Sequence, residues 1–177
     1  MKPFVISLAS LAMAIGLASA ADANKAAVPG TDDLTRYTAS KATPGGQTTL
    51  RTPSGRTLGT ASTTGTRTTF RDSAGRTTGT ASIEGNRTVF RDSAGRTLGT
   101  ATASGSGTTT YRDAAGRTLG TGSETDGRTT FRDASGRTRS TAEKTEPTTT
   151  FRDSAGRTLG TLSTTGGKKA SPAKRGR

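Results

Sequence analysis

The apolar side chains of this chain are few, and they return at a fixed spacing within a polar, threonine-rich background. A peptide close to F-R-D-S-A-G-R-T-L-G-T occurs six times, beginning at Leu50, Phe70, Phe90, Tyr111, Phe131 and Phe151. Successive starts lie 20 residues apart, with one interval of 21. A fixed period of this length indicates a tandem repeat in which each unit buries its apolar face against its neighbours.

Each unit has the pattern of a β-hairpin. In the third unit, residues 88–92 (T-V-F-R-D) favour a strand, residues 93–95 (S-A-G) a turn, and residues 96–100 (R-T-L-G-T) a second strand. An Asp-x-x-Gly sequence is typical of a type I turn, because the Asp side chain caps the turn and Gly takes the left-handed position after it. Pairing across the turn predicts Phe90 opposite Leu98 on one face, and Arg91 opposite Thr97 on the other.

We therefore expect an all-β protein whose tandem hairpin repeats form an elongated antiparallel sheet. A parallel β-solenoid is the alternative, although the Asp-x-x-Gly turn favours hairpins. Repetition of the unit predicts an apolar stripe made of Phe70, Phe90, Leu98, Tyr111, Leu119, Phe131, Phe151 and Leu159. The expected turn residues are Asp72 and Gly75, Asp92 and Gly95, Asp113 and Gly116, Asp133 and Gly136, and Asp153 and Gly156.

The D-x-x-G-R turns resemble the core of YD (RHS) repeats, a family of β-hairpin units of about this length. The segment from Asp72 to Arg76 and its copies from Asp92, Asp113, Asp133 and Asp153 carry this resemblance. The layout is also similar to that of curli-type fibre subunits, in which a signal and a short leader precede strand-turn-strand units. The first resemblance implies repeated β-hairpins, and the second implies strand-turn-strand units of a fibre subunit.

The chain divides into four parts by composition. Residues 1–20 have the layout of a Sec-type signal peptide, with Lys2, an apolar run over residues 4–17 and the small residues A-S-A before cleavage after Ala20. Residues 21–49 read as a flexible leader, residues 50–167 as the six repeats, and residues 168–177 as a basic, disordered tail. We expect a mature chain without an integral membrane segment that is secreted, periplasmic or on the cell surface.

The residue types needed for most catalytic sites are missing. The chain contains no His and no Cys, which excludes Ser-His-Asp and Cys-His catalysis and the usual zinc ligand sets. Each repeated Asp precedes a turn and lies near two arginines, so capping and ion pairing account for it. The sequence thus predicts a protein that is not an enzyme and holds no cofactor or metal.

The formal net charge of +13 directs attention to anionic partners. If the hairpins align, a basic strip forms opposite the apolar stripe from Arg71, Arg91, Arg112, Arg132 and Arg152. Guanidinium groups suit phosphate, sulfate and carboxylate, so the strip would attract lipopolysaccharide, acidic polysaccharide or extracellular DNA. These features predict a structural or adhesive role at the cell envelope or in the extracellular matrix. The alternative is a self-assembling, amyloid-like fibre subunit.

Overall fold

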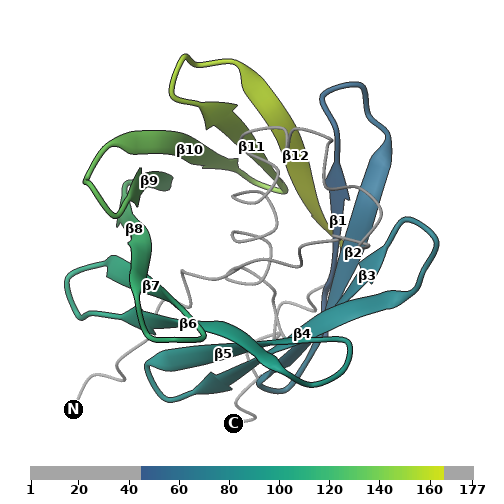
Figure 1. The fold of residues 1–177 in the computed structure, drawn as a ribbon. Helices are drawn as coiled ribbons and strands as arrows, with labels where there is room; N and C mark the ends of the chain where they lie inside the picture. The colour runs from purple at the N-terminus through teal and green to yellow at the C-terminus, as the bar shows by residue number, and fades with distance from the viewer. Residues whose placement is uncertain (1–44, 166–177) are drawn as a thin grey trace, which may run out of the picture.

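Twelve antiparallel strands make up the fold in a computed structural model that describes residues 45–165. Every strand belongs to one sheet, and the strands follow one another around a ring in chain order (Figure 1). The strands are β1 (Gln47–Arg51), β2 (Thr57–Thr64), β3 (Arg67–Asp72), β4 (Thr77–Glu84), β5 (Arg87–Asp92), β6 (Thr97–Ala103), β7 (Thr108–Asp113), β8 (Thr118–Thr125), β9 (Arg128–Asp133), β10 (Thr138–Thr145), β11 (Thr148–Asp153) and β12 (Thr158–Thr165).

The sheet closes into a barrel because the last strand pairs with the first. β12 lies antiparallel to β1, with Leu162 opposite Leu50 and Thr165 opposite Gln47. The all-β hairpin prediction is confirmed, whereas the elongated open sheet and the parallel solenoid are both wrong. Strand twist curves a sheet of this many strands, and closure satisfies the backbone N–H and C=O groups that two free edges would leave unpaired.

The closing pair has the same register as the pairs between successive repeats. Leu162 faces Leu50 just as Ala61 faces Phe70 and Ala142 faces Phe151. Because the registers repeat around the ring, the six hairpins are related by rotation about the barrel axis. Equivalent residues of different repeats therefore lie at the same level along that axis.

A β-bulge in each hairpin sets which residues face the interior. In the third repeat, Arg91 is opposite Thr97 but Phe90 is opposite Gly99, so Leu98 is the extra residue of the bulge. The predicted pairing of Phe90 with Leu98 is therefore wrong, since one inserted residue moves every later position by one. Leu98 still packs against the core, although it remains partly exposed near the end of the barrel.

The core is a ring of alternating large and small side chains on the inner wall. Phe70 lies between Ala61 on β2 and Gly79 on β4, and Phe90 lies between Ala81 and Gly99 in the same way. Burying an aromatic side chain contributes about 1.5–3 kcal/mol, and the small neighbours leave space for the ring. The buried cluster comprises Leu50, Ala61, Phe70, Ala81, Phe90, Ala101, Tyr111, Phe131, Ala142, Phe151 and Leu162.

Two sites depart from this alternation of aromatic and small residues, and at each site a change in the size of one side chain is offset by a change in its neighbour. At the closing pair, Leu50 replaces an aromatic residue and Leu162 replaces an alanine, which keeps the number of side-chain carbons the same as in a Phe–Ala pair. Gly122 takes the place of an alanine beside Tyr111, and a Cβ atom there would lie 3.1 Å from the Tyr111 hydroxyl. The extra oxygen of Tyr111 therefore uses the space that a methyl group occupies in other repeats.

The expected subdivision of the chain is only partly covered by the described residues. The proposed signal peptide, the leader up to residue 44 and the basic tail lie outside them. β1 begins at Gln47, three residues before the first predicted repeat, and the extra residue of the 21-residue interval falls in the connection between β6 and β7. Within residues 45–165, no helix is long and apolar enough to cross a membrane.

Candidate anion-binding surface

The antiparallel order of the strands gives the barrel two chemically different ends. Six tight turns, at residues 52–56, 73–76, 93–96, 114–117, 134–137 and 154–157, connect the two strands of each repeat and form what we call the turn end. The connections between successive repeats form the opposite, connection end. The described chain also starts and finishes there, since β1 begins beside the last residues of β12.

Each turn is held by the backbone and by one capping side chain. In the third repeat, the Asp92 N–H donates to the Arg96 carbonyl (2.9 Å), and the Gly95 N–H donates to the Asp92 carbonyl (3.0 Å). The Asp92 carboxylate accepts hydrogen bonds from the N–H groups of Ala94 and Arg96. Gly95 has a φ of 82°, in the left-handed region that glycine enters at little cost. The first repeat has Thr52 in place of Asp, and its hydroxyl accepts from the Arg56 N–H.

The turn carboxylates also form ion pairs that favour their charged form. Asp92 Oδ2 lies 2.6 Å from Arg96 Nε, and this contact is the largest cause of the lowered pKa of Asp92. For Asp72, Asp113 and Asp153, the leading cause of the lowered pKa is the backbone N–H of the arginine four residues later. These aspartates are therefore ionised at neutral pH and occupied with the turn.

One set of six arginines circles the outer wall next to the turns. The Arg71 side chain leaves the strand on the face opposite Phe70, and its Nη1 donates to the Gly75 carbonyl and the Thr77 hydroxyl, both at 3.2 Å. The corresponding bond to the turn glycine is 3.0–3.3 Å long in every repeat. We call this set the wall arginines: Arg51, Arg71, Arg91, Arg112, Arg132 and Arg152. Their side chains are fixed in position while remaining exposed.

A second set projects from the turns themselves. Arg96 follows Gly95, and its side chain is 82% exposed although Nε contacts Asp92. Arg76, Arg117 and Arg157 have the same ion pair and are 79–82% exposed. We call this set the turn arginines: Arg56, Arg76, Arg96, Arg117, Arg137 and Arg157. In Arg76, Arg96, Arg117 and Arg157, the Nε contact leaves the terminal guanidinium nitrogens available to an oxyanion.

Charge is distributed very unevenly between the two ends. Together with Arg139, the turn end carries thirteen arginines against five aspartates, a formal charge of +8. The connection end of the described chain has Arg67, Arg87, Arg128 and Lys144 against Glu84, Glu124, Asp126, Glu143 and Glu146, a formal charge of −1. The described part of the barrel is therefore strongly basic at one end and close to neutral at the other.

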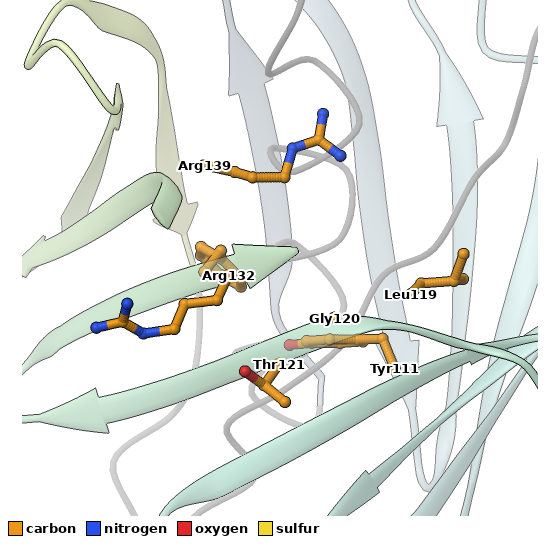
Figure 2. Close-up of a pocket in the computed structure, with 7 residues that line it drawn as sticks. Tyr111, Leu119, Gly120, Thr121, Arg132 and Arg139 are labelled. Atoms are coloured by element: carbon orange, nitrogen blue, oxygen red, sulfur yellow. The ribbon is translucent and has the colours of Figure 1, made fainter. Parts of the chain in front are cut away.

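Arg139 extends the basic surface inward. It occupies the bulge position at which other repeats have Leu58, Leu98, Leu119 or Leu159. Figure 2 shows Arg139 and Leu119 projecting to one side of the wall while Arg132 projects to the other. The small hollow between them has a volume of about 10 Å³, about what a single water molecule needs, so it is no ligand pocket.

A second hollow lies on the outer wall and is open to solvent. It has a volume of about 310 Å³ and is lined by Arg87, Arg112 and Asp113 together with threonines of β6. Hydroxyl and guanidinium groups facing one shallow space can bind a sulfate or phosphate group on a longer molecule. This hollow includes one of the arginines that the sequence singled out.

The structure brings the predicted arginines together but also adds to them. Arg71, Arg91, Arg112, Arg132 and Arg152 share one level of the outer wall, with Arg51 as their equivalent in the first repeat. The turn arginines and Arg139 are absent from the predicted set, although the regular D-x-x-G-R spacing could have identified the former. Within residues 45–165, no group of three or more His, Cys, Asp or Glu side chains could hold a metal ion.

Comparison with known proteins gives little further information. No family model matches the chain, and no curated protein matches it. A solved structure that does match is the X-ray structure of a protein from Arabidopsis thaliana, with 9% sequence identity and a TM-score of 0.48 over 71% of this chain and 83% of that one. The function of the present chain therefore has to be argued from its own residues.

Proposed function

We propose that this chain is an exported, non-enzymatic protein with a structural or adhesive role at the cell envelope or in the extracellular matrix. It binds anionic polymers, such as lipopolysaccharide, acidic polysaccharide or extracellular DNA, through its repeated arginines. The observation that carries the proposal is the concentration of thirteen arginines at one end of the barrel, with a formal charge of +8. The signal-like residues 1–20 supply the argument for export.

The arrangement of the arginines supports binding of a polymer in preference to a small ligand. Neighbouring strands are about 4.8 Å apart and tilt by about 40°, so wall arginines at one level of successive repeats are separated by roughly 12 Å. The wall arginines are also held by bonds to the turn, which lowers the side-chain entropy that binding costs. Evenly spaced, pre-positioned guanidinium groups suit a chain with regularly spaced negative charges.

A salt titration of heparin binding tests this proposal. The logarithm of the association constant should fall linearly with the logarithm of the salt concentration, because binding releases counterions. Replacing Arg71, Arg91 and Arg112 by Gln should weaken binding at low salt, and the slope should fall by about one for each sulfate group that the variant no longer neutralises. The matched control replaces Arg67, Arg128 and Lys144 of the connection end by Gln, which removes the same charge. Absence of binding at low salt, or equal weakening in both triple variants, contradicts the proposal.

The fibre hypothesis has a specific obstacle in the closed sheet. Each of the twelve described strands pairs on both sides, so addition of a further chain at a strand edge requires that β1 and β12 separate. Growth of β-rich fibrils from a solution of folded protein would favour this alternative. A chain that stays monomeric at high concentration would count against it.

A further inference from the structure

We infer that the turn end is a docking surface for an anionic lipid membrane, with the barrel axis standing upright on the bilayer. This inference rests on the proposed function and narrows its partner to a lipid surface. It is argued from the level arrangement of the turns, from the leucines inside the arginine ring and from the chemistry of the opposite end.

The arginines of the turn end lie in a ring that can meet a flat surface all at once. The strand registers repeat around the closed barrel, so the six turns end at one level. With about 4.8 Å between strands and a usual tilt near 40°, twelve strands form a ring roughly 24 Å across. A single flexible polymer contacts only part of such a ring at a time, whereas a plane of headgroups contacts all six turns.

Leucine side chains lie within the ring of arginines. Leu58, Leu98, Leu119 and Leu159 hold four of the six bulge positions next to the turns, where each packs against the core yet stays partly exposed. Thr78 and Arg139 hold the other two. An apolar centre with a cationic rim matches the interface of a bilayer, where phosphates lie next to hydrocarbon. Polysaccharide and nucleic acid backbones offer no hydrocarbon partner for these leucines, and for this reason the lipid surface is favoured.

The opposite end is suited to face away from the membrane. Its formal charge is −1 among the described residues, and both ends of the described chain, Gly45 and Thr165, emerge there. The charge difference between the two ends of the described barrel favours approach of the turn end to an anionic surface, whereas the basic residues that follow Thr165 in the sequence oppose that orientation. The ends of the described chain are consequently kept clear of the docking surface.

Co-sedimentation with two kinds of vesicle tests the inference. The protein used is the chain from residue 21 onward, as expected after cleavage at Ala20. Vesicles of equal parts phosphatidylcholine and phosphatidylglycerol should bind the protein in a salt-sensitive way, and vesicles of phosphatidylcholine alone should bind it far less. An arginine near an anionic membrane is worth about fivefold in affinity, so replacing Arg76, Arg96 and Arg117 by Gln should weaken binding on the order of a hundredfold. The control is the connection-end variant R67Q/R128Q/K144Q, which should bind nearly as well as the unchanged protein.

A leucine variant separates lipid docking from general polyanion binding. Thr78 naturally occupies the bulge position of the second repeat, so the fold accepts Thr there. Replacing Leu98, Leu119 and Leu159 by Thr should weaken vesicle binding at least about tenfold while leaving heparin binding unchanged. A circular dichroism melt of each variant verifies that it is folded at the assay temperature.

The outcomes distinguish this inference from the proposed function. Binding of heparin without binding of anionic vesicles overturns lipid docking and leaves the proposed function in place. Binding of neither overturns both. Vesicle binding that is unaffected in the leucine variant, or equally reduced in the connection-end variant, overturns end-on docking.

Discussion

The two ends of the barrel are built from short connections that follow different rules. At the turn end, the six turns share one backbone geometry, one capping position and two arginine positions. At the connection end, the residues between strands read G-T, G-N, S-G-S-G, D-G and E-P, with different lengths, charges and backbone shapes. The strands in between have nearly identical register throughout.

This difference indicates that the turns, more than the connections between repeats, determine the structure of each unit. A connection that only has to return the chain to the next strand tolerates variation, because loop closure depends weakly on length and composition. The turn end is uniform because each turn defines the local register and also directs two guanidinium groups. Because the turns are uniform and the connections vary, we infer that the fold constrains the residues of the turns more strongly.

Insertion of one residue should give the largest difference in stability between the turn end and the connection end. A glycine inserted after Ala94 breaks the backbone bonds between Asp92, Gly95 and Arg96, and should lower the free energy of unfolding by about 2 kcal/mol or more. A glycine inserted after Gly105, in the connection that is already longer, should cost less than about 0.6 kcal/mol. Urea denaturation of both variants measures the difference. Equal destabilisation would mean that the two ends are equally constrained.

Alanine substitution of glycine gives a smaller, matched effect. Gly95 has a φ of 82°, so G95A forces a side chain into a left-handed conformation and should cost about 1–2 kcal/mol. A Cβ atom at Gly105 meets no atom within 4 Å and no such backbone strain, so G105A should change stability by less than about 0.5 kcal/mol. Thermal melts of the pair are sufficient, and a stable G95A variant would refute the turn geometry.

Acid should weaken the turn end selectively. The pKa values of Asp72, Asp92, Asp113 and Asp153 are lowered in the folded chain, so their contribution to stability is present at neutral pH and is lost as the pH falls through their folded pKa values, below about 4. The melting temperature should therefore fall as the pH is lowered from about 6 to about 3. Replacing these four residues by Asn should flatten that dependence. An unchanged pH profile would show that the ion pairs contribute nothing.

The sequence predicts local features of this fold better than those that depend on distant residues. The turn from Asp92 to Gly95 follows from four adjacent residues, and the structure has the backbone bonds of that turn. The bulge at Leu98 depends on how β5 and β6 pair, which no local pattern signals. Closure depends on Leu50 meeting Leu162 at opposite ends of the array, so an open sheet is the simpler expectation from sequence.

The candidate site likewise has one part that the sequence predicts and one part that it does not. The wall arginines are predictable because they alternate with the buried aromatic residues along a strand. The ring that they form with the turn arginines is not, since it requires the sheet to close. The charge difference between the D-x-x-G-R segments and the connections is nevertheless readable in the sequence, and it would have located the basic end.

The size-matched pair of Leu50 and Leu162 has a consequence for how such a gene can change. Tandem repeats gain and lose whole copies by recombination, and an open array accepts either event. Here the first and last units are marked by their leucines, so a copy duplicated between them leaves the closing pair intact and only widens the ring. A copy added before Leu50 would instead set an aromatic ring against Leu162, where the space is already filled. The fold therefore tolerates a change in the number of internal repeats better than a repeat added at either end.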